Sequence, residues 1–434
     1  MFGRKIRLLI LMITLVLFLS ACTQDISPAA KPAGSVQPDA AGLLFRITWT
    51  DYSGRGEAIA KIVSAYKQNS PDPVTMISGD EDMQAIALML DAGEPALYVL
   101  PYRYVKHFGA KGSLFDLTDA FQQDKAAFYP QVWDLGTVSG KTYGIPWLGH
   151  AMCLLYNKTL LGKAGVDAVS INSLASLVSA MEQVEKNTDA KGIGLVGAQG
   201  NDISWMVNQF IYGFGASLVS EDGKSVSINS RQSRDAIDIY KNTLGAHAQP
   251  TWLEDTGAEV MAHFLAQEVA FEIQGIWGLT DIRKNGDPFD VGVIAMSDVG
   301  LRAEVGPMML ALPAGMDEAK KSEALAFIRY LISAKAQEQI LLGEYSPEHD
   351  AYYPFRTPIR KDMLSGQAYH AYPEYVMFVE GFQNPSIDVP VPAWQKVKDD
   401  YYGPGLHKVM SGELSIDDFL LQIQTEGNRL LKTE

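Results

Sequence analysis

Short apolar runs alternate with segments of helical periodicity in the first third of the chain. Three runs have the length and composition of β-strands, namely residues 43–49, 74–77 and 97–100. Between them, residues 57–69 and 83–91 carry apolar side chains at the three- and four-residue spacing of amphipathic helices. Strands that alternate with helices form βαβ units. The pattern therefore predicts an α/β fold with a parallel sheet.

Helical spacing dominates the rest of the chain. Further helices are predicted over residues 173–184, 203–214, 231–244, 259–267, 317–333 and 416–431. We expect Asn172 to cap the first of these and Asn201-Asp202 to cap the second, because a short polar side chain accepts a free backbone N–H there. With 434 residues, of which 47% are hydrophobic and 20% charged, the chain is globular and long enough for two or three domains.

The N-terminal segment has a different pattern. A short cationic start precedes residues 8–19, which carry no charge. This apolar run is shorter than the roughly 20 residues that a membrane-spanning helix needs, so it is typical of a secretory signal. The Ser20-Ala21-Cys22 that follows resembles the lipobox of bacterial lipoproteins. The resemblance implies cleavage before Cys22 and acyl chains such as palmitate on this residue.

We therefore expect a signal peptide over residues 1–21 and a lipidated cysteine with a flexible tether over residues 22–42. The tether has three prolines and no aromatic residue, so it cannot bury enough apolar surface to fold. The protein would be extracytoplasmic and anchored to the cell membrane through lipid only. An ordinary signal peptide followed by a chance cysteine is the alternative.

The net charge of the chain argues against some classes of partner. The net charge of −15 becomes −18 when the signal peptide leaves with its three cationic residues. Nucleic acid is a poor partner for such a chain, because its binding depends on Lys and Arg contacts to phosphates.

Cys153 lies in an apolar run and is expected to be a buried, inert thiol. The seven histidines show no metal-ligand spacing, so no metal is expected.

Several motifs follow one another in a distinctive order. The first is Gly140–Trp147, which reads Gly-Lys-Thr-Tyr-Gly-Ile-Pro-Trp. The later ones are Leu154–Lys158, Ala164-Gly165, Phe264–Trp277, Gly306–Pro313, Ala324–Gln337, Tyr353–Arg356, Trp394 and Leu414–Leu431. Together they resemble the extracellular solute-binding proteins of bacterial ABC importers, in the group that includes maltose-binding protein. Two segments depart from the family pattern, Val169–Asn172 and Pro95–Leu97, and the second leaves the contacts near Tyr102 less defined.

The resemblance implies the two-lobe periplasmic-binding-protein type II fold, also called a Venus flytrap. The lobes would comprise residues 43–148 with 308–345, and residues 149–307 with 346–434. The chain would cross between them near residues 146–151, 306–311 and 344–354. The ligand would lie between the lobes and favour a closed hinge. The resemblance further implies a monomer that delivers its ligand to the permease subunits of an ABC transporter.

Aromatic and polar residues at strand ends and crossings form the candidate ligand site. A carbohydrate needs flat rings against its C–H faces and polar side chains for its hydroxyls. The expected ligand-binding residues are Trp49, Asp51, Asp80, Tyr102, Trp147, His150, Trp205, Gln274, Trp277 and Arg356. Ligands of open α/β sheets bind beyond the carboxyl ends of strands, which favours Trp49 and Tyr102. Glu272 is a further hydrogen-bonding candidate, and a structural salt bridge is the alternative role for Arg356.

No catalytic residue and no cofactor are expected. Gly192–Gly197 fits the pattern G-x-G-x-x-G, but it follows a helix and has the composition of a strand, whereas a dinucleotide site needs these glycines between a strand and a helix. The sequence thus predicts a non-enzymatic lipoprotein that carries a mono- or oligosaccharide to a permease. Two alternatives stay open, a ligand-binding partner of a membrane sensor and a secreted carbohydrate-active enzyme, whose carboxylate pair would be a tertiary feature.

Overall fold

The computed structural model describes residues 42–48, 55–68, 70, 73–79, 82–341, 343–354, 356–365 and 372–432. The predicted signal peptide, Cys22 and the tether up to residue 41 lie outside the described residues. So do three of the predicted ligand-binding residues, namely Trp49, Asp51 and Asp80.

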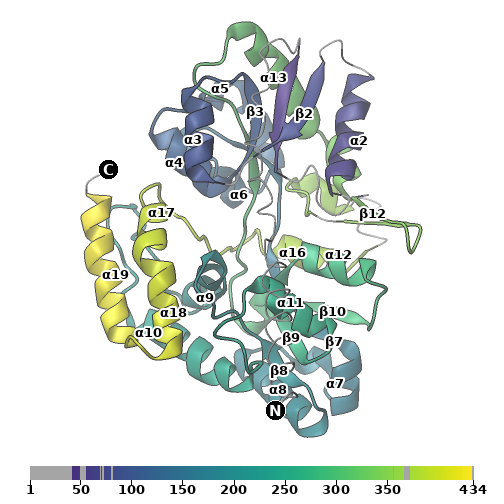
Figure 1. Cartoon of the computed structure of the whole chain (residues 1–434), viewed down its shortest axis with the longest axis vertical. Coiled ribbons are helices and arrows are strands. Elements are labelled where there is room, and N and C mark those ends of the chain that lie inside the picture. The colour runs from purple at the N-terminus through teal and green to yellow at the C-terminus, as the bar shows by residue number, and fades with distance from the viewer. Residues whose placement is uncertain are drawn as a thin grey trace, which may run out of the picture. The chain divides into compact units, whose positions relative to one another are not determined.

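Two β-sheets form the framework (Figure 1). The first has the order β2-β1-β3-β11-β6, with β1 (Leu43–Ile47), β2 (Val74–Ser78), β3 (Ala96–Pro101), β6 (Ile145–Leu148) and β11 (Met308–Ala311). The second has the order β10-β7-β9-β8, with β7 (Met152–Asn157), β8 (Lys191–Gly194), β9 (Val269–Gly275) and β10 (Val291–Ile294). Two small antiparallel pairs are β4 (Thr137–Val138) with β5 (Lys141–Thr142), and β12 (Glu344–Ser346) with β13 (Ala351–Tyr353).

The α/β class is confirmed, and the three strands predicted in the first third of the chain do pair in parallel, but each of the two large sheets also contains antiparallel strands. Strand β1 pairs in parallel with β2 and β3, as βαβ units require. Strand β11, however, runs antiparallel to both β3 and β6. In the second sheet, β8 and β9 are parallel, whereas β7 runs antiparallel to β9 and β10. The reason is that β7 and β11 each enter their sheet from the other sheet, not through a helical crossover within one sheet.

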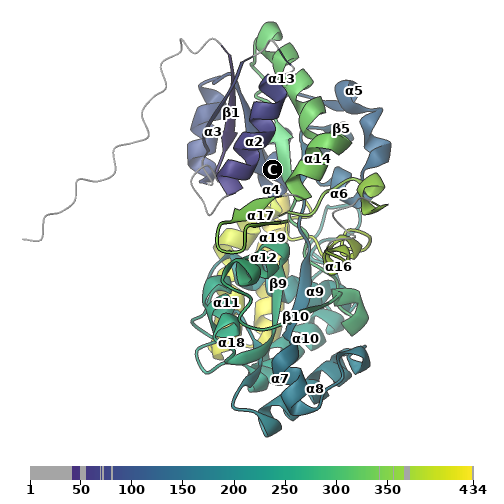
Figure 2. The same cartoon turned by 90° about the vertical axis from the view of Figure 1, so that its right-hand side faces the viewer.

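Helices cover both sheets (Figures 1 and 2). Those of the first half are α2 (Arg55–Lys67), α3 (Met83–Asp91), α4 (Tyr102–Ala110), α5 (Thr118–Phe121), α6 (Pro130–Asp134), α7 (Lys158–Ala164), α8 (Leu174–Asn187) and α9 (Asn201–Gly213). Those of the second half are α10 (Arg231–Asp238), α11 (Gly257–Leu265), α12 (Ile276–Lys284), α13 (Glu318–Leu331), α14 (Ala334–Leu341), α16 (Tyr375–Glu380), α17 (Trp394–Val397), α18 (Gly403–Ser411) and α19 (Ile416–Leu431). None of the described helices has the length and apolar character that crossing a bilayer requires.

The residues that cap helices α8 and α9 differ from those predicted from the sequence. Ser173, not Asn172, caps α8: its hydroxyl accepts the N–H of Ser176, whose own hydroxyl accepts the N–H of Ser173. Helix α9 starts after Gly200 without a side-chain cap. The Asp202 carboxylate instead accepts the N–H of Gly257 at the start of α11, 3.0 Å away. A tertiary contact therefore replaces the local cap that the sequence suggested.

Buried apolar side chains pack against both sheets. Phe45 of β1 meets Phe327 of α13 edge-on at 5.2 Å, and Tyr66 of α2 packs on the same phenylalanine at 4.7 Å. Cys153 lies in β7 of the second sheet and is buried. Burial raises the pKa of its thiol well above the usual value. The expectation of a buried thiol is confirmed.

Three segments that link the sheets are joined by backbone hydrogen bonds. Gly149, between β6 and β7, exchanges two such bonds with Thr357, at 2.8 and 3.0 Å. The N–H of Gly306, before β11, donates to the carbonyl of His150 at 3.3 Å. A Cβ on Gly306 would lie 2.3 Å from the His150 ring, so glycine lets this ring lie directly on the backbone. The linking segments therefore fix His150 beside the site described next. The residue limits predicted for the two lobes stay a prediction.

Candidate functional site

Two adjoining cavities share the walls formed by Trp205 and Trp277. The first, of about 270 Å³, is lined by Arg55, Pro101, Tyr102, Arg103, His150, Trp205, Trp277, Glu304, Gly306, Pro307, Met308, Arg356 and Asp388. The second, of about 350 Å³, is lined by Met152, Asp202, Trp205, Met206, Gly257, Ala258, Met261, Gln274, Trp277 and Asp281. The first cavity takes residues from helices and strands of both sheets, so it lies between them.

The indole of Trp277 is fixed by contacts around it. Trp277 follows β9 in the first turn of α12, and its ring lies on Gly275, where a Cβ would approach to 2.1 Å. The ring of His150 meets it edge-on at 4.8 Å between centroids. The guanidinium carbon of Arg356 lies 5.1 Å from the ring centroid. A ligand in either cavity therefore meets a pre-oriented aromatic surface.

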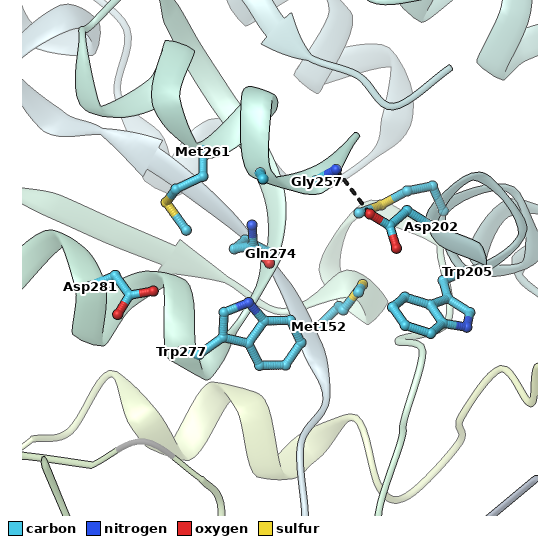
Figure 3. A pocket seen from close by; sticks show the side chains of 10 residues that line it. Met152, Asp202, Trp205, Gly257, Met261, Gln274, Trp277 and Asp281 are labelled. Carbon is cyan, nitrogen blue, oxygen red and sulfur yellow. Dashed lines mark hydrogen bonds between the residues drawn. The ribbon is translucent and has the colours of Figure 1, made fainter. Parts of the chain in front are cut away.

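Trp205 on α9 is oriented through a buried carboxylate. Its indole N–H donates to Asp388 Oδ2 at 2.9 Å. Asp388 also accepts from Asn208 Nδ2 at 3.2 Å and forms an ion pair with Lys398, and both members of this pair are buried. Because the N–H is already satisfied, Trp205 offers the cavity its apolar ring. Figure 3 shows the two indoles on either side of Met152.

A polar chain of contacts closes one end of the first cavity. Arg356 Nη1 lies 3.3 Å from His150 Nδ1, and His150 Nε2 lies 3.1 Å from Glu304 Oε2. A guanidinium only donates, so Nδ1 must accept and the Nε2–H must donate to Glu304. Burial lowers the pKa of His150 below its usual value; the Glu304 carboxylate opposes this shift, and the positive charges of Arg356 and Arg103 add to it. His150 is therefore neutral near pH 7.

The second cavity combines thioethers with hydrogen-bonding groups. Asp202 and Gln274 each accept a backbone N–H at 3.0 Å, from Gly257 and Gly275, through one side-chain oxygen. The other Asp202 oxygen and the Gln274 amide N–H₂ can accept from and donate to ligand hydroxyls. Within the described part of the chain, no three His, Cys, Asp or Glu side chains are grouped so that they could hold a metal ion.

Direct contacts join the two sides of the first cavity. The hydroxyl of Tyr102, at the start of α4, accepts the N–H of Val389 at 3.0 Å. Arg55, at the start of α2, bonds to Glu344 Oε2 at 3.3 Å and Asp281 Oδ1 at 3.5 Å. These contacts connect helices of the first sheet to segments packed with the second, across the cavity.

The structure brings most of the predicted residues together. The first cavity contains Tyr102, His150, Trp205, Trp277 and Arg356, and the second contains Gln274. Trp147 lines neither. It lies in β6 of the first sheet and is fully buried, with its ring centroid 5.6 Å from that of Phe45. Gln337 Nε2 donates to its backbone carbonyl at 3.1 Å. At this position the indole contributes to the core of the first sheet.

Several cavity residues were not predicted, notably Arg55, Arg103, Asp202, Glu304 and Asp388. Arg103 is the second residue after the end of β3, so the rule that pointed to Tyr102 could have found it. Asp388 lies in an irregular segment, and no local pattern marks it. Its contacts with Trp205 and Asn208 join residues that are 183 and 180 positions apart in the sequence.

Glu272 is buried in β9 and lines neither cavity, although it was a candidate for hydrogen bonds to the ligand. Neither of its carboxyl oxygens has a hydrogen-bond partner among the described residues. Burial raises its pKa well above the usual value, and the nearby Gln274 amide opposes this only in part. Folding therefore favours the protonated form of this side chain.

We expect Glu272→Gln to raise the free energy of unfolding by about 1 to 3 kcal/mol at pH 8, because the variant avoids protonating a buried acid. The pKa of Glu272 is higher in the folded than in the unfolded protein. The wild type is therefore destabilised by this residue only when the pH rises above the unfolded-state pKa of about 4.3. The gain should therefore vanish near pH 4. Urea denaturation at both pH values measures it, with the exposed Glu182→Gln as control. An equal gain at both pH values would contradict the assignment.

Comparison with solved structures shows the same fold. A receptor from Streptomyces glaucescens, solved unliganded and with acarbose, aligns with a TM-score of 0.74 at 21% identity over 90% of this chain and 98% of its own. A maltose-bound protein of T. maritima aligns with a TM-score of 0.74 at 20% identity over 90% and 99%. A protein of Mycobacterium tuberculosis, in complex with glycerophosphocholine, gives 0.73 at 17% identity over 92% and 99%. The expected two-lobe fold is confirmed.

Sequence comparison gives two further results. A curated binding protein of Brucella abortus is 24% identical over 209 residues, which is 46% of this chain and 49% of that protein. The chain thus spans about half the length of the curated relatives that it matches. A family model described as "Bacterial extracellular solute-binding protein" matches residues 45–375.

Proposed function

Because the chain belongs to the family of bacterial extracellular solute-binding proteins, we propose that it captures a mono- or oligosaccharide and delivers it to the permease subunits of an ABC importer. The family resemblance of the sequence motifs is thereby confirmed. The observation that carries the proposal is the pair of indoles, Trp205 and Trp277, shared by two cavities with polar ends. The acarbose and maltose bound to two proteins of the same fold support a saccharide.

The site has the groups that saccharide binding requires. Indole faces stack on the C–H faces of sugar rings, while Asp202 and Gln274 bond to hydroxyls. Micromolar affinity corresponds to about 8 kcal/mol. A few buried hydrogen bonds and two stacked rings are sufficient for this when lobe closure excludes water. We take residues 43–148 with 308–345 and residues 149–307 with 346–434 as the two lobes of a monomer.

The proposal includes no catalytic step, and the curated relatives are likewise named as binding proteins. Titration of the purified protein with a panel of neutral and acidic saccharides tests it, with calorimetry and tryptophan fluorescence as readouts. We expect saturable binding in the micromolar range or tighter, and a fluorescence change from the two indoles. A peptide or a metal ion that binds tightly, together with no response to any saccharide, would contradict the proposal.

We further propose that the mature protein begins at a lipidated Cys22 and that residues 22–42 tether the binding lobes to the cell membrane. Cys22→Ala should move the protein from the membrane fraction to the soluble fraction, because the acyl chains supply the membrane affinity. Cys153→Ala is the matched control, since this thiol is buried in the folded part of the chain. Fractionation followed by immunoblotting measures the distribution. Retention of the Cys22→Ala variant in the membrane fraction would exclude a lipid anchor at this residue.

A further inference from the structure

The second sheet contains a buried acid that pairs with no other group. Both carboxyl oxygens of Glu272 in β9 are without a hydrogen-bond partner among the described residues, and the side chain is fully buried. Burying a polar group without a hydrogen bond destabilises the folded state, so such groups are uncommon in proteins and call for an explanation. The position of Glu272 relative to the second cavity supplies one.

Glu272 and Gln274 lie on the same face of β9, because they are two residues apart in a strand. Gln274 lines the second cavity, where Figure 3 shows it between Met261 and Trp277. Glu272 is the next side chain on this face, one step further from the carboxyl end of the strand, and lines neither cavity. It therefore lies behind Gln274 as seen from the cavity.

Two helices pack closely on this face of the strand. The residue opposite Glu272 on β8 is Gly194, where a Cβ would approach a side chain of α11 to 2.7 Å. At Gly278 of α12, a Cβ would lie 2.2 Å from Cγ of Gln274 and 2.7 Å from Cε of Met261. The two glycines thus make room for the polar side chains, and the close packing around them restricts their movement.

The Gln274 amide is divided between the protein and the cavity. Its Oε1 accepts the N–H of Gly275 at 3.0 Å, which leaves the two Nε2 hydrogens for other acceptors. One possible acceptor is a ligand hydroxyl in the second cavity. The other is the Glu272 carboxyl group, on which the Gln274 amide acts by opposing part of the rise in its pKa. The amide therefore connects the buried acid to the ligand.

We propose that Glu272 is a positioning residue of the saccharide site: its carboxyl group, buried behind Gln274, sets the orientation in which the Gln274 amide meets a ligand hydroxyl. This rests on the proposed function, because it concerns the same saccharide site. A neutral carboxyl group accepts weakly and leaves the Nε2 hydrogens for the ligand. An ionised carboxylate forms a hydrogen bond about twice as strong and draws the amide away from the cavity.

The pH dependence that follows has a definite sign. Burial raises the pKa of Glu272 well above its usual value, so the neutral, binding-competent form persists as the pH rises until this raised pKa is reached. Ionisation of Glu272 above it should weaken saccharide binding. By linkage, a bound saccharide that uses the Gln274 amide should in turn favour the neutral form of Glu272.

The titratable and charged groups of the elements that contact β9 do not explain the raised pKa. They are Cys153 and Tyr156 on β7, Lys191 on β8, Glu182, Glu185 and Lys186 on α8, Glu259 and His263 on α11, and Asp281, Arg283 and Lys284 on α12. None of these groups is among the causes of the raised pKa of Glu272, which are burial and the opposing Gln274 amide. His150 of the first cavity has a lowered pKa, so it stays neutral above pH 7.

A double-mutant cycle tests whether Glu272 acts through Gln274. The probe is the tightest-binding member of a panel of glucose, galactose, maltose and maltotriose, and calorimetry at pH 7 measures its affinity. We expect Glu272→Leu to weaken binding by about 3- to 10-fold, which corresponds to one hydrogen bond. In the Gln274→Ala background the same substitution should change the affinity by less than about 1.5-fold, because the amide that it orients is absent.

The pH profile supplies a readout that a purely structural role would not change. Between pH 7 and pH 9.5 the wild type should lose about 3-fold or more in affinity. Glu272→Gln, which is neutral at every pH and similar in shape, should keep most of the affinity at pH 7 and show no such loss. The exposed Glu182→Gln is the matched control and should follow the wild type. Circular dichroism checks that each variant is folded.

The outcomes separate this role from the proposed function. Equal losses for Glu272→Leu with and without Gln274, or the same pH profile for the wild type and Glu272→Gln, would overturn the positioning role and leave saccharide capture intact. No binding of any panel member to the wild type would contradict saccharide capture itself.

Discussion

Replacing Trp277 with alanine should lower the affinity for the saccharide by about 30- to 1000-fold, because a central tryptophan commonly contributes 2 to 4 kcal/mol of binding energy. The effect should be large because Trp277 lines both cavities and is held on Gly275 by neighbours on several sides. Trp277→Phe keeps an aromatic face and should lose less. Calorimetric titration with the tightest ligand of the panel measures both variants.

Trp252→Phe is a suitable control, since Trp252 packs near Tyr240 and lines neither cavity. Its variant should bind as the wild type does. If Trp277→Ala kept wild-type affinity while the protein remained folded, the two indoles would not be the ligand platform, and the site would have to be placed elsewhere.

Replacing Asp388 with alanine should lower the free energy of unfolding by about 3 to 5 kcal/mol, because it leaves a buried lysine without its counter-ion. Lys398 and Asp388 are at most 2% exposed. The substitution also removes the acceptor of the Trp205 indole and of Asn208. The variant should therefore lose ligand affinity as well, since the Trp205 ring is no longer held. Urea denaturation and calorimetry report the two effects separately.

Two further variants separate charge from packing at this place. Asp388→Asn with Lys398→Met removes both charges and should recover a substantial part of the lost stability. Asp400→Ala breaks an exposed pair with Lys396 and should cost less than about 0.5 kcal/mol. Similar losses for Asp388→Ala and Asp400→Ala would show that the buried pair does not stabilise the fold.

Local pattern predicted much of the fold. The helices at residues 83–91 and 416–431 have the predicted limits, because Asp82 and Ser415 cap them and their apolar faces repeat regularly. Strands β1, β2 and β3 were found in the same way. The antiparallel direction of β7 and β11 was not predicted, because it depends on which sheet the chain has just left. Local periodicity carries no information on that.

Some residues of the site could be predicted from the sequence, and others could not. Tyr102 and Trp277 each follow a strand end, so a positional rule was sufficient to find them. Trp147 has the same local appearance, but its side chain lies on the core side of β6 against Phe45. Arg55 and Asp388 reach the cavity through contacts between segments far apart in sequence. Their contribution to the charge of the site could be recognised only after the chain was folded.

The most direct test of saccharide capture is a crystal structure with the tightest-binding saccharide of the panel. We predict that sugar rings lie against Trp205 and Trp277, with hydroxyls bonded to Asp202 or Gln274. A saccharide bound outside both cavities, in contact with neither indole, would contradict this mode of capture.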